Sequence, residues 1–266
     1  MIRISSLSNK KIKEIEQLKK SGVRKERGLI VVDGFREILL AYQSGWEIVE
    51  LFYCPELAKK GDINKFKLAE QKIVEVSGGV FNKICYKEKP DGFLATIKGR
   101  EFSLADIKLS RQPLIIILEK VEKPGNIGAI LRTAYAAGAD ALIINDNQTD
   151  IYNPNIIRAS EGFIFLKPLV SASLEETIIW LKNNKIKSVA AATSATKNYT
   201  KINLRDGVAI VLGSEDSGLS KKWLESANEL IKIKMEKGID SLNVSVSAAI
   251  IVYEALRQRE NNDKSL

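Results

Sequence analysis

The feature that most limits the fold is a series of short apolar runs that lack polar alternation. Residues 114–119, 141–145 and 208–212 are almost wholly aliphatic, and such runs are typical of strands buried on both faces. Between them, segments such as 126–137 and 174–185 have apolar residues at helical spacing. We therefore predict an α/β fold with a mostly parallel sheet and helices on both faces. Ligands of such sheets bind at the carboxyl ends of the strands.

The rest of the chain continues this alternation. In the first part we predict a helix at 10–20 capped by Ser8 or Asn9, a basic loop at 21–27, helices at 35–45 and 63–71, and strands at 28–34, 47–53, 73–77 and 92–98. In the second part we predict helices at 154–160, 219–227 and 244–258, and strands at 162–170, 188–193 and 230–235. The polar stretch 99–112, which ends before Pro113, is the best linker candidate. We expect two domains, residues 1–108 and 109–266.

Charge and histidine content limit the chemistry. The 266 residues include 41 Lys and Arg against 33 Asp and Glu, and no histidine. A Ser-His-Asp triad, a Cys-His dyad and an HExxH zinc site are therefore excluded. Two cysteines are too few for a structural zinc site, so we expect no metal.

The basic excess lies toward the front of the chain. Residues 1–110 carry 21 basic and 15 acidic side chains, a pattern typical of proteins that contact nucleic-acid phosphates. A solvated helix face is the alternative interpretation. The RNA-binding candidates are Lys10, Lys11, Arg24, Lys25 and Arg27.

The sequence predicts neither export nor membrane insertion. Its first residues lack the apolar core of a signal peptide. The apolar runs are far shorter than the roughly 20 residues needed to cross a bilayer. We therefore expect a cytoplasmic protein without a membrane partner.

Three glycine-bearing loops each follow a predicted strand and open a helix: residues 123–132, 212–220 and 233–249. Glycine allows tight turns and close approach of a ligand to the backbone, although it also simply ends strands. Neither the P-loop pattern nor the GxGxxG fingerprint is present, which argues against nucleoside triphosphate or NAD.

Together these loops resemble a known family. The ordered patterns NxGAxxR at 126–132, GSExxGLS at 213–220 and SLNVSVSAA at 241–249 are similar to the signature motifs of SpoU (TrmH-type) RNA 2'-O-ribose methyltransferases of the SPOUT superfamily. Residues 5–15, 24–34 and 89–98 resemble the amino-terminal RNA-binding domain of that family's ribosomal-RNA branch.

The resemblance implies a carboxyl-terminal trefoil-knotted α/β domain with a mostly parallel sheet. It would follow a smaller α/β RNA-binding domain that resembles ribosomal proteins. The resemblance further implies S-adenosyl-L-methionine as cofactor, an RNA partner and a homodimer formed through the knotted domain. The matching cofactor-binding positions are Leu212, Gly213, Gly218, Ile233, Met235 and Leu242, and the matching catalytic positions are Asn126, Arg132, Glu215, Ser241 and Asn243.

The implied reaction is methyl transfer to a ribose 2'-hydroxyl, most simply in large-subunit ribosomal RNA. Because guanidinium stays protonated in proteins, we expect Arg132 to anchor the adjacent phosphate and polarise the hydroxyl. For Asn243, capping of the helix that starts at Val244 is a serious alternative role. The alternative functions are a transfer-RNA methyltransferase, a non-catalytic ribosome assembly factor and a small-molecule methyltransferase; the basic front domain argues against the last.

Overall fold

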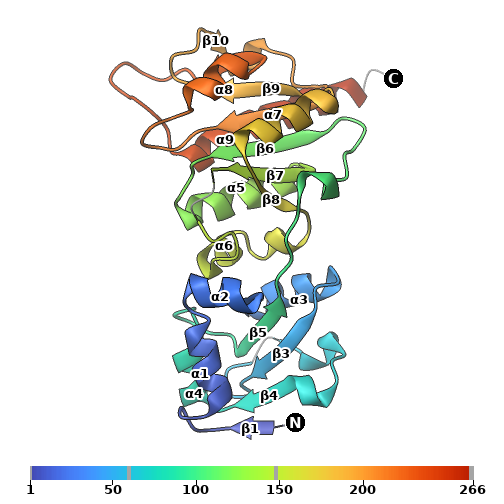
Figure 1. Ribbon diagram of the computed structural model, residues 1–266, viewed down its shortest axis with the longest axis vertical. Helices are drawn as coiled ribbons and strands as arrows, with labels where there is room; N and C mark the ends of the chain where they lie inside the picture. Colours follow the sequence, from blue (N-terminus) through green and yellow to red (C-terminus); the bar gives the residue numbers. More distant parts are fainter. Residues whose placement is uncertain (1, 59–60, 147–148, 264–266) are drawn as a thin grey trace. The chain divides into compact units, whose positions relative to one another are not determined.

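The computed structural model describes residues 2–58, 61–146 and 149–263. These residues form two compact units (Figure 1). The first comprises Met1–Arg100 together with Tyr152–Leu166, and the second comprises Glu101–Ile151 and Lys167–Leu266. Each unit has its own sheet.

The first unit is built on a mixed five-stranded sheet of order β1-β4-β3-β5-β2. Its strands are β1 (Ile2–Ile4), β2 (Leu29–Asp33), β3 (Ile48–Tyr53), β4 (Ile73–Val76) and β5 (Phe93–Lys98). The strands β1, β4 and β3 run parallel, whereas β5 runs antiparallel to both β3 and β2.

Helices α1 (Lys10–Gln17) and α4 (Gly78–Ile84) share one core with this sheet. The core includes Ile12 and Ile15 of α1 and Phe81 of α4, so the apolar spacing predicted for α1 is its buried face. Asn9 caps α1 by accepting from the Lys11 amide at 2.9 Å, which confirms one of the two predicted caps. Helix α3 (Phe35–Gln43) carries Phe35, whose ring packs edge to face on Phe93.

Residues 21–27 are a helix, not the basic loop that the sequence predicted. Arg24 of this helix, α2 (Ser21–Arg27), is only 5% exposed. Its Nη1 donates to the carbonyls of Leu18 at 2.6 Å and Lys19 at 2.9 Å. The guanidinium therefore satisfies carbonyl groups left open at the end of α1.

Other differences concern short elements. The structure has β1 and α4, which were not predicted, and two 3₁₀ helices (Ile63–Phe66 and Glu70–Lys72) in place of a helix at 63–71. The predicted strand at 162–170 is wrong over its first half. There a 3₁₀ helix (Phe163–Phe165) precedes strand β8 (Leu169–Ala172).

The segment Tyr152–Leu166 comes from the second part of the chain but belongs to the first unit. It contains α6 (Pro154–Ala159). The indole Nε1 of Trp46 donates to the Phe165 carbonyl at 3.0 Å, and Arg36 of α3 forms an ion pair with Glu161. Gly162 approaches Glu37 so closely that an added Cβ would lie 2.9 Å from the Glu37 Cα, which leaves no space for a side chain.

The second unit is built on a seven-stranded sheet of order β10-β12-β9-β11-β6-β7-β8. Every neighbouring pair in this sheet is parallel, as predicted. Besides β8, the strands are β6 (Leu114–Glu119), β7 (Ala141–Asn145), β9 (Lys187–Ala191), β10 (Lys197–Asn198), β11 (Val208–Leu212) and β12 (Glu229–Lys232). Because the strands are parallel, the loops after β6, β9, β11 and β12 leave the sheet at the same edge.

Helices cover both faces of this sheet. On one face α7 (Leu174–Asn183) and α8 (Lys221–Ser226) share a core with Ile115 and Ile117 of β6. Alternation along the strand turns Ile116 and Leu118 to the other side, and both are fully buried. Helices α5 (Pro124–Ala136) and α9 (Val244–Asp263) pack against each other, and α9 also contacts β11. A short 3₁₀ helix (Leu104–Asp106) lies in the predicted linker, and another (Tyr199–Lys201) follows β10.

Arg259 ties the last helix to the beginning of the second unit. Its guanidinium donates to the carbonyls of Gln112 at 2.9 Å, Pro113 at 3.3 Å, Leu204 at 3.1 Å and Asp206 at 2.9 Å. Burial lowers the pKa of this guanidinium from its ordinary value. One side chain thus satisfies carbonyl groups from two distant segments.

Candidate active site

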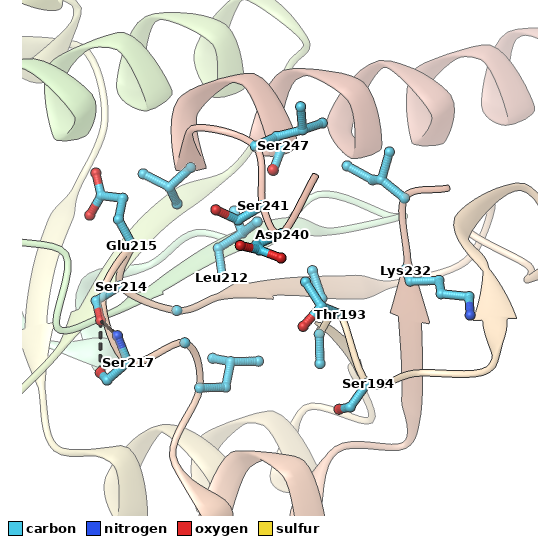
Figure 2. A pocket seen from close by; sticks show the side chains of 18 of the residues that line it. Thr193, Ser194, Leu212, Ser214, Glu215, Ser217, Lys232, Asp240, Ser241 and Ser247 are labelled. Carbon is cyan, nitrogen blue, oxygen red and sulfur yellow. Dashed lines mark hydrogen bonds between the residues drawn. The ribbon is translucent and has the colours of Figure 1, made fainter. Parts of the chain in front are cut away.

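A pocket lies at the carboxyl edge of the second sheet and has a volume of about 460 Å³. Its walls are the residues after β9 (191–194), the loop after β11 (212–219), and parts of the segment that runs from β12 into α9 (Figure 2). Small-molecule sites in proteins measure about 300–1,000 Å³. The pocket is therefore large enough for a cofactor of ordinary size.

The loop after β11 closes back on itself. Gly218 donates its amide to the Ser214 carbonyl at 3.1 Å, and the hydroxyls of Ser214 and Ser217 lie 2.8 Å apart (Figure 2). A Cβ at Gly213 would lie 2.2 Å from the Gly218 carbonyl carbon, closer than any real contact. Only glycine at 213 allows this closed loop.

A residue at the end of β6 holds the carboxyl-terminal end of the same loop in place. The buried Glu119 accepts the Ser220 amide at 2.7 Å through Oε2, and Ser220 caps α8 through its side chain. The pocket wall therefore begins at the end of one central strand and is anchored to the next strand in the sheet.

All six residues predicted to bind the cofactor line the pocket. They supply apolar side chains and glycine backbone: Leu212, Gly213, Gly218, Ile233, Met235 and Leu242. The sequence did not single out the lining residues Ala191–Ser194. They follow a predicted strand of the same parallel sheet, so the rule that ligands bind at carboxyl ends of strands could have found them.

Three of the five predicted catalytic residues form one hydrogen-bonded chain, although 117 residues separate the first from the last. The Nδ2 of Asn126, in the first turn of α5, donates to Oε1 of Glu215. The Nδ2 of Asn243 donates to Oδ1 of Asn126 at 3.3 Å. Asn243 also accepts from the Ser245 amide at 2.9 Å, so it has the helix-capping contact as well as a contact to the site.

Ser241 and Arg132 occupy different places. Ser241 lines the pocket together with Glu215. Arg132 is exposed and lies farther along α5, outside the pocket lining. The structure thus brings Asn126, Glu215, Asn243 and Ser241 to one end of the sheet. It leaves Arg132 where it is accessible to a large substrate.

The charge of the pocket differs from that of the whole chain. Its lining includes three carboxylates, Glu215, Asp216 and Asp240, but only one ammonium group, Lys232. In Figure 2 the Glu215 carboxylate points toward α5, on the side of the pocket opposite Thr193 and Ser194. Such a lining repels phosphates and attracts cations. Together with its apolar and backbone groups, it fits S-adenosyl-L-methionine, whose sulfonium is positively charged.

The predicted RNA-binding residues lie in the first unit and fall into two groups. Lys10, Lys25 and Arg27 are exposed, and Lys11 is partly buried in an ion pair with Glu50. The prediction for Arg24 is corrected, because Arg24 is buried and its guanidinium donates to carbonyl groups at the end of α1. We therefore remove Arg24 from the set of surface cations.

Residues 2–58, 61–146 and 149–263 contain neither a candidate membrane-spanning helix nor a candidate metal-binding cluster. No helix in these ranges is long and apolar enough to span a membrane. The same ranges contain no group of three or more His, Cys, Asp or Glu placed to hold a metal ion.

Comparison with known proteins relates both units to described families. Residues 113–253 match the SpoU rRNA Methylase family, and residues 9–95 match the MRM3-like substrate binding domain. A 23S rRNA (guanosine(2553)-2'-O)-methyltransferase of Bacillus subtilis is 26% identical, with 95% of this chain and 98% of the relative aligned.

Solved structures agree with this relationship. An RNA 2'-O ribose methyltransferase is 37% identical with a TM-score of 0.83, over 97% of this chain and 100% of that one. An AdoMet-bound rRNA methyltransferase from Sinorhizobium meliloti is 27% identical with a TM-score of 0.87, over 96% and 97%. The similarity extends over essentially the whole chain.

Proposed function

The chain belongs to the SpoU rRNA methylase family, an S-adenosyl-L-methionine-dependent RNA 2'-O-methyltransferase fold, and from this premise we propose that it methylates a ribose 2'-hydroxyl in large-subunit ribosomal RNA. The observation that carries the proposal is the pocket at the carboxyl edge of the second sheet. Its lining includes the residues to which we assign cofactor binding, and hydrogen bonds join Glu215 of this lining to Asn126 and Asn243 of the other two motifs.

The cofactor would be held mainly by backbone and apolar groups. We assign this role to Leu212, Gly213 and Gly218 of the loop after β11, and to Ile233, Met235 and Leu242 of the segment after β12. When bound, S-adenosyl-L-methionine supplies an electrophilic methyl group on a sulfonium. The closed loop at Gly213–Gly218 is preorganised, which reduces the entropy lost when the ligand binds.

The protein's main task is to align the hydroxyl oxygen with the methyl carbon and the sulfur. Glu215 lines the pocket and its carboxylate points toward α5, and hydrogen bonds link it to Asn126 and, through Asn126, to Asn243. We assign this series the task of orienting the ribose. Ser241 lines the same pocket and can donate or accept a hydrogen bond. Arg132 has the planar fork suited to a phosphate oxygen pair, and we assign it the phosphate next to the target ribose.

Ribosomal RNA is favoured over transfer RNA as substrate. The B. subtilis relative that aligns over nearly its whole length is named for 23S rRNA, and the first unit matches a substrate binding domain over residues 9–95. A non-catalytic assembly factor is disfavoured because the Asn126–Glu215 contact joins a helix and a loop that a pure RNA binder would have no chemical need to connect.

We assign RNA delivery to residues 1–108 and methyl transfer to residues 109–266. The exposed cations Lys10, Lys25 and Arg27, with Lys11 beside them, are suited to phosphate contacts. Such contacts hold the RNA backbone without reading bases. We expect the enzyme in the cytoplasm, where ribosomal RNA is available.

We also infer a homodimer and a trefoil knot in the second unit. Val246 and Tyr253 are 47% and 49% exposed and lie seven residues apart on α9, so one face of this helix is an apolar stripe. A second copy would bury that stripe. The proposal of a knot rests on membership of the SpoU family.

The decisive experiment measures transfer of a labelled methyl group from S-adenosyl-L-methionine to unmodified 23S rRNA and, separately, to bulk transfer RNA. We expect incorporation into the ribosomal RNA that makes one phosphodiester linkage resistant to alkali. Arg132→Ala should abolish it, and Arg132→Lys, which keeps the charge but loses the planar fork, should restore little. Incorporation into transfer RNA alone would refute the substrate, and near-normal turnover by Arg132→Lys would refute the bidentate phosphate contact.

A further inference from the structure

The neighbouring strands β6 and β7 each end in a buried polar residue. Glu119 is the last residue of β6 and Asn145 the last residue of β7, and the two are direct partners in the parallel ladder. They are 1% and 0% exposed. Ile117 and Ile143, two positions earlier, belong to the core under α7 and α8, and side chains two positions apart on a strand share a face. Glu119 and Asn145 therefore lie side by side under these helices.

The hydrogen bonds of Asn145 determine which way its amide faces. Its Nδ2 donates to the carbonyls of Ala172 at 3.0 Å and Ser173 at 3.3 Å and to the hydroxyl of Thr177 at 2.7 Å. Because carbonyl oxygens only accept, the amide cannot be turned the other way round. Ala172 ends β8, which borders β7 on the side away from β6. The other polar atom of the amide, Oδ1, is therefore directed toward β6.

The carboxylate of Glu119 has one oxygen engaged on the other side. Its Oε2 accepts the Ser220 amide at 2.7 Å, at the end of the loop that follows β11. Strand β11 borders β6 on the side away from β7, so the second oxygen, Oε1, is on the β7 side. Adjacent strands lie about 4.8 Å apart. Oε1 of Glu119 and Oδ1 of Asn145 therefore face each other across one strand spacing.

These two oxygens are buried acceptors, and neither has a hydrogen-bond donor among the described residues. In the described part of the second unit, one other buried side-chain nitrogen or oxygen lacks a partner, and it is a donor, Nε1 of Trp223. Trp223 lies in α8 and packs in the core under α7 and α8. Its backbone amide donates to the hydroxyl of Ser220 at 3.4 Å, so it lies near the end of β6. Burial without a partner is unfavourable for all three atoms.

We propose that one internal water molecule binds between Glu119, Asn145 and Trp223. Its two hydrogens donate to Glu119 Oε1 and Asn145 Oδ1, and its oxygen accepts from Trp223 Nε1. Buried waters make about three such bonds to groups that otherwise lack partners, and a bridging water spans up to about 5.5 Å between two acceptors. A metal cation or a proton shared between the two oxygens would leave the indole N–H without an acceptor. Water satisfies all three atoms.

The water site lies behind the loop after β11, which forms one wall of the cofactor pocket. Glu119 holds the Ser220 amide, and the preceding residue, Leu219, lines the pocket and belongs to the same core as Trp223. The water thus joins the ends of β6 and β7 to α8 and keeps Leu219 in place. Glu119 and Asn145 are positioning residues that act on cofactor affinity through this wall, and this part of the proposal rests on the proposed function.

A high-resolution crystal structure of the whole chain tests the water site directly. We expect an ordered water within about 3.2 Å of Glu119 Oε1, Asn145 Oδ1 and Trp223 Nε1. In solution, the Trp223 indole proton should show a nuclear Overhauser contact with a long-lived water, assigned through the signal that is lost in Trp223→Phe. Direct contact between the two oxygens, an ordered metal ion or a protein side chain between them would overturn the proposal.

Two substitutions of Glu119 separate the water from the loop contact. In Glu119→Gln the side-chain oxygen still accepts the Ser220 amide, and Nε2 donates directly to Asn145 Oδ1 and displaces the water. The water signal should disappear, while the dissociation constant for S-adenosyl-L-methionine stays within about twofold. Glu119→Leu removes both acceptors, so this constant should rise by about fivefold to tenfold.

The matched control is Glu225→Leu, because Glu225 is an exposed residue of α8 outside the pocket lining. It should bind the cofactor normally. A water retained in Glu119→Gln would overturn the bridging role, and normal cofactor affinity in folded Glu119→Leu would overturn the role of the wall. If Glu119→Leu does not fold, the wild-type crystal structure and Glu119→Gln decide. Wild-type protein that binds no S-adenosyl-L-methionine would instead refute the proposed function, and the crystal structure would still decide the water site.

Discussion

Replacement of Gly213 by alanine tests whether the loop after β11 must close for the cofactor to bind. The added Cβ would lie 2.2 Å from the Gly218 carbonyl carbon, 2.3 Å from its oxygen and 2.5 Å from the Leu219 amide nitrogen. Ordinary contact begins near 3.4 Å, so the loop would have to open by about 1.2 Å. All three atoms belong to the backbone, and no side chain can swing away to make space.

The energetic consequence follows from overpacking. Forcing one extra carbon into a packed site costs about 1–3 kcal/mol. In the cofactor-free variant the loop can open and avoid the clash. Cofactor binding requires the closed loop, so the energetic cost lowers the affinity for the cofactor. Because 1.4 kcal/mol corresponds to a tenfold change, we expect the dissociation constant for S-adenosyl-L-methionine to rise by about fivefold to 140-fold.

Titration calorimetry with the cofactor measures this change, and urea denaturation of the same samples reports stability. Gly79→Ala is the control: it lies in α4, and its Cβ would meet nothing within 4 Å. This control should bind the cofactor normally and gain up to about 1 kcal/mol from helix propensity. Normal cofactor affinity in Gly213→Ala, at unchanged stability, would refute the closed-loop explanation.

Three further predictions concern stability and RNA binding. Arg259→Met removes a charged donor from four carbonyl groups and should lower the free energy of unfolding, measured by urea denaturation, by about 2 kcal/mol. An unchanged midpoint of urea denaturation would contradict a stabilising role for these contacts. Burial raises the pKa of Asp33, so the folded state keeps a proton that the unfolded chain has lost, and stability falls as pH rises through that window. Asp33→Asn should therefore gain stability relative to wild type in thermal denaturation as the pH rises above the ordinary aspartate pKa, and a difference that stays constant with pH would argue against it. Lys25→Glu with Arg27→Glu should weaken RNA binding and reduce the slope of log affinity against log salt by about 0.7–0.9 per lost contact, whereas Lys182→Glu on α7 should change neither.

Much of the second unit follows from local patterns in the sequence. The aliphatic runs at 114–119, 141–145 and 208–212 became the parallel strands β6, β7 and β11, because a strand buried on both faces has no polar side to alternate with. The loops after these strands could also be identified as the ligand edge, since parallel strands end on the same side.

Local patterns were misleading where charged residues were used inside the fold. Arg24 lies in a basic stretch that predicts an exposed loop, yet its guanidinium is buried against the end of α1. Nothing in the neighbouring residues signals this role, because the carbonyl groups that it satisfies become available only when α1 ends at Gln17. A long side chain with five donors serves either purpose.

Sequence alone determined the elements, the parallel sheet, the glycine loops and the residue types available for chemistry. The tertiary structure decided which of those residues meet. Asn126, Glu215 and Asn243 lie on three separate segments, and Tyr152–Leu166 leaves its sequence neighbours to join the first unit. The physical reason is range: helix and strand periodicity depends on residues a few positions apart. A hydrogen bond between distant segments depends on how the whole sheet is ordered and how its loops close.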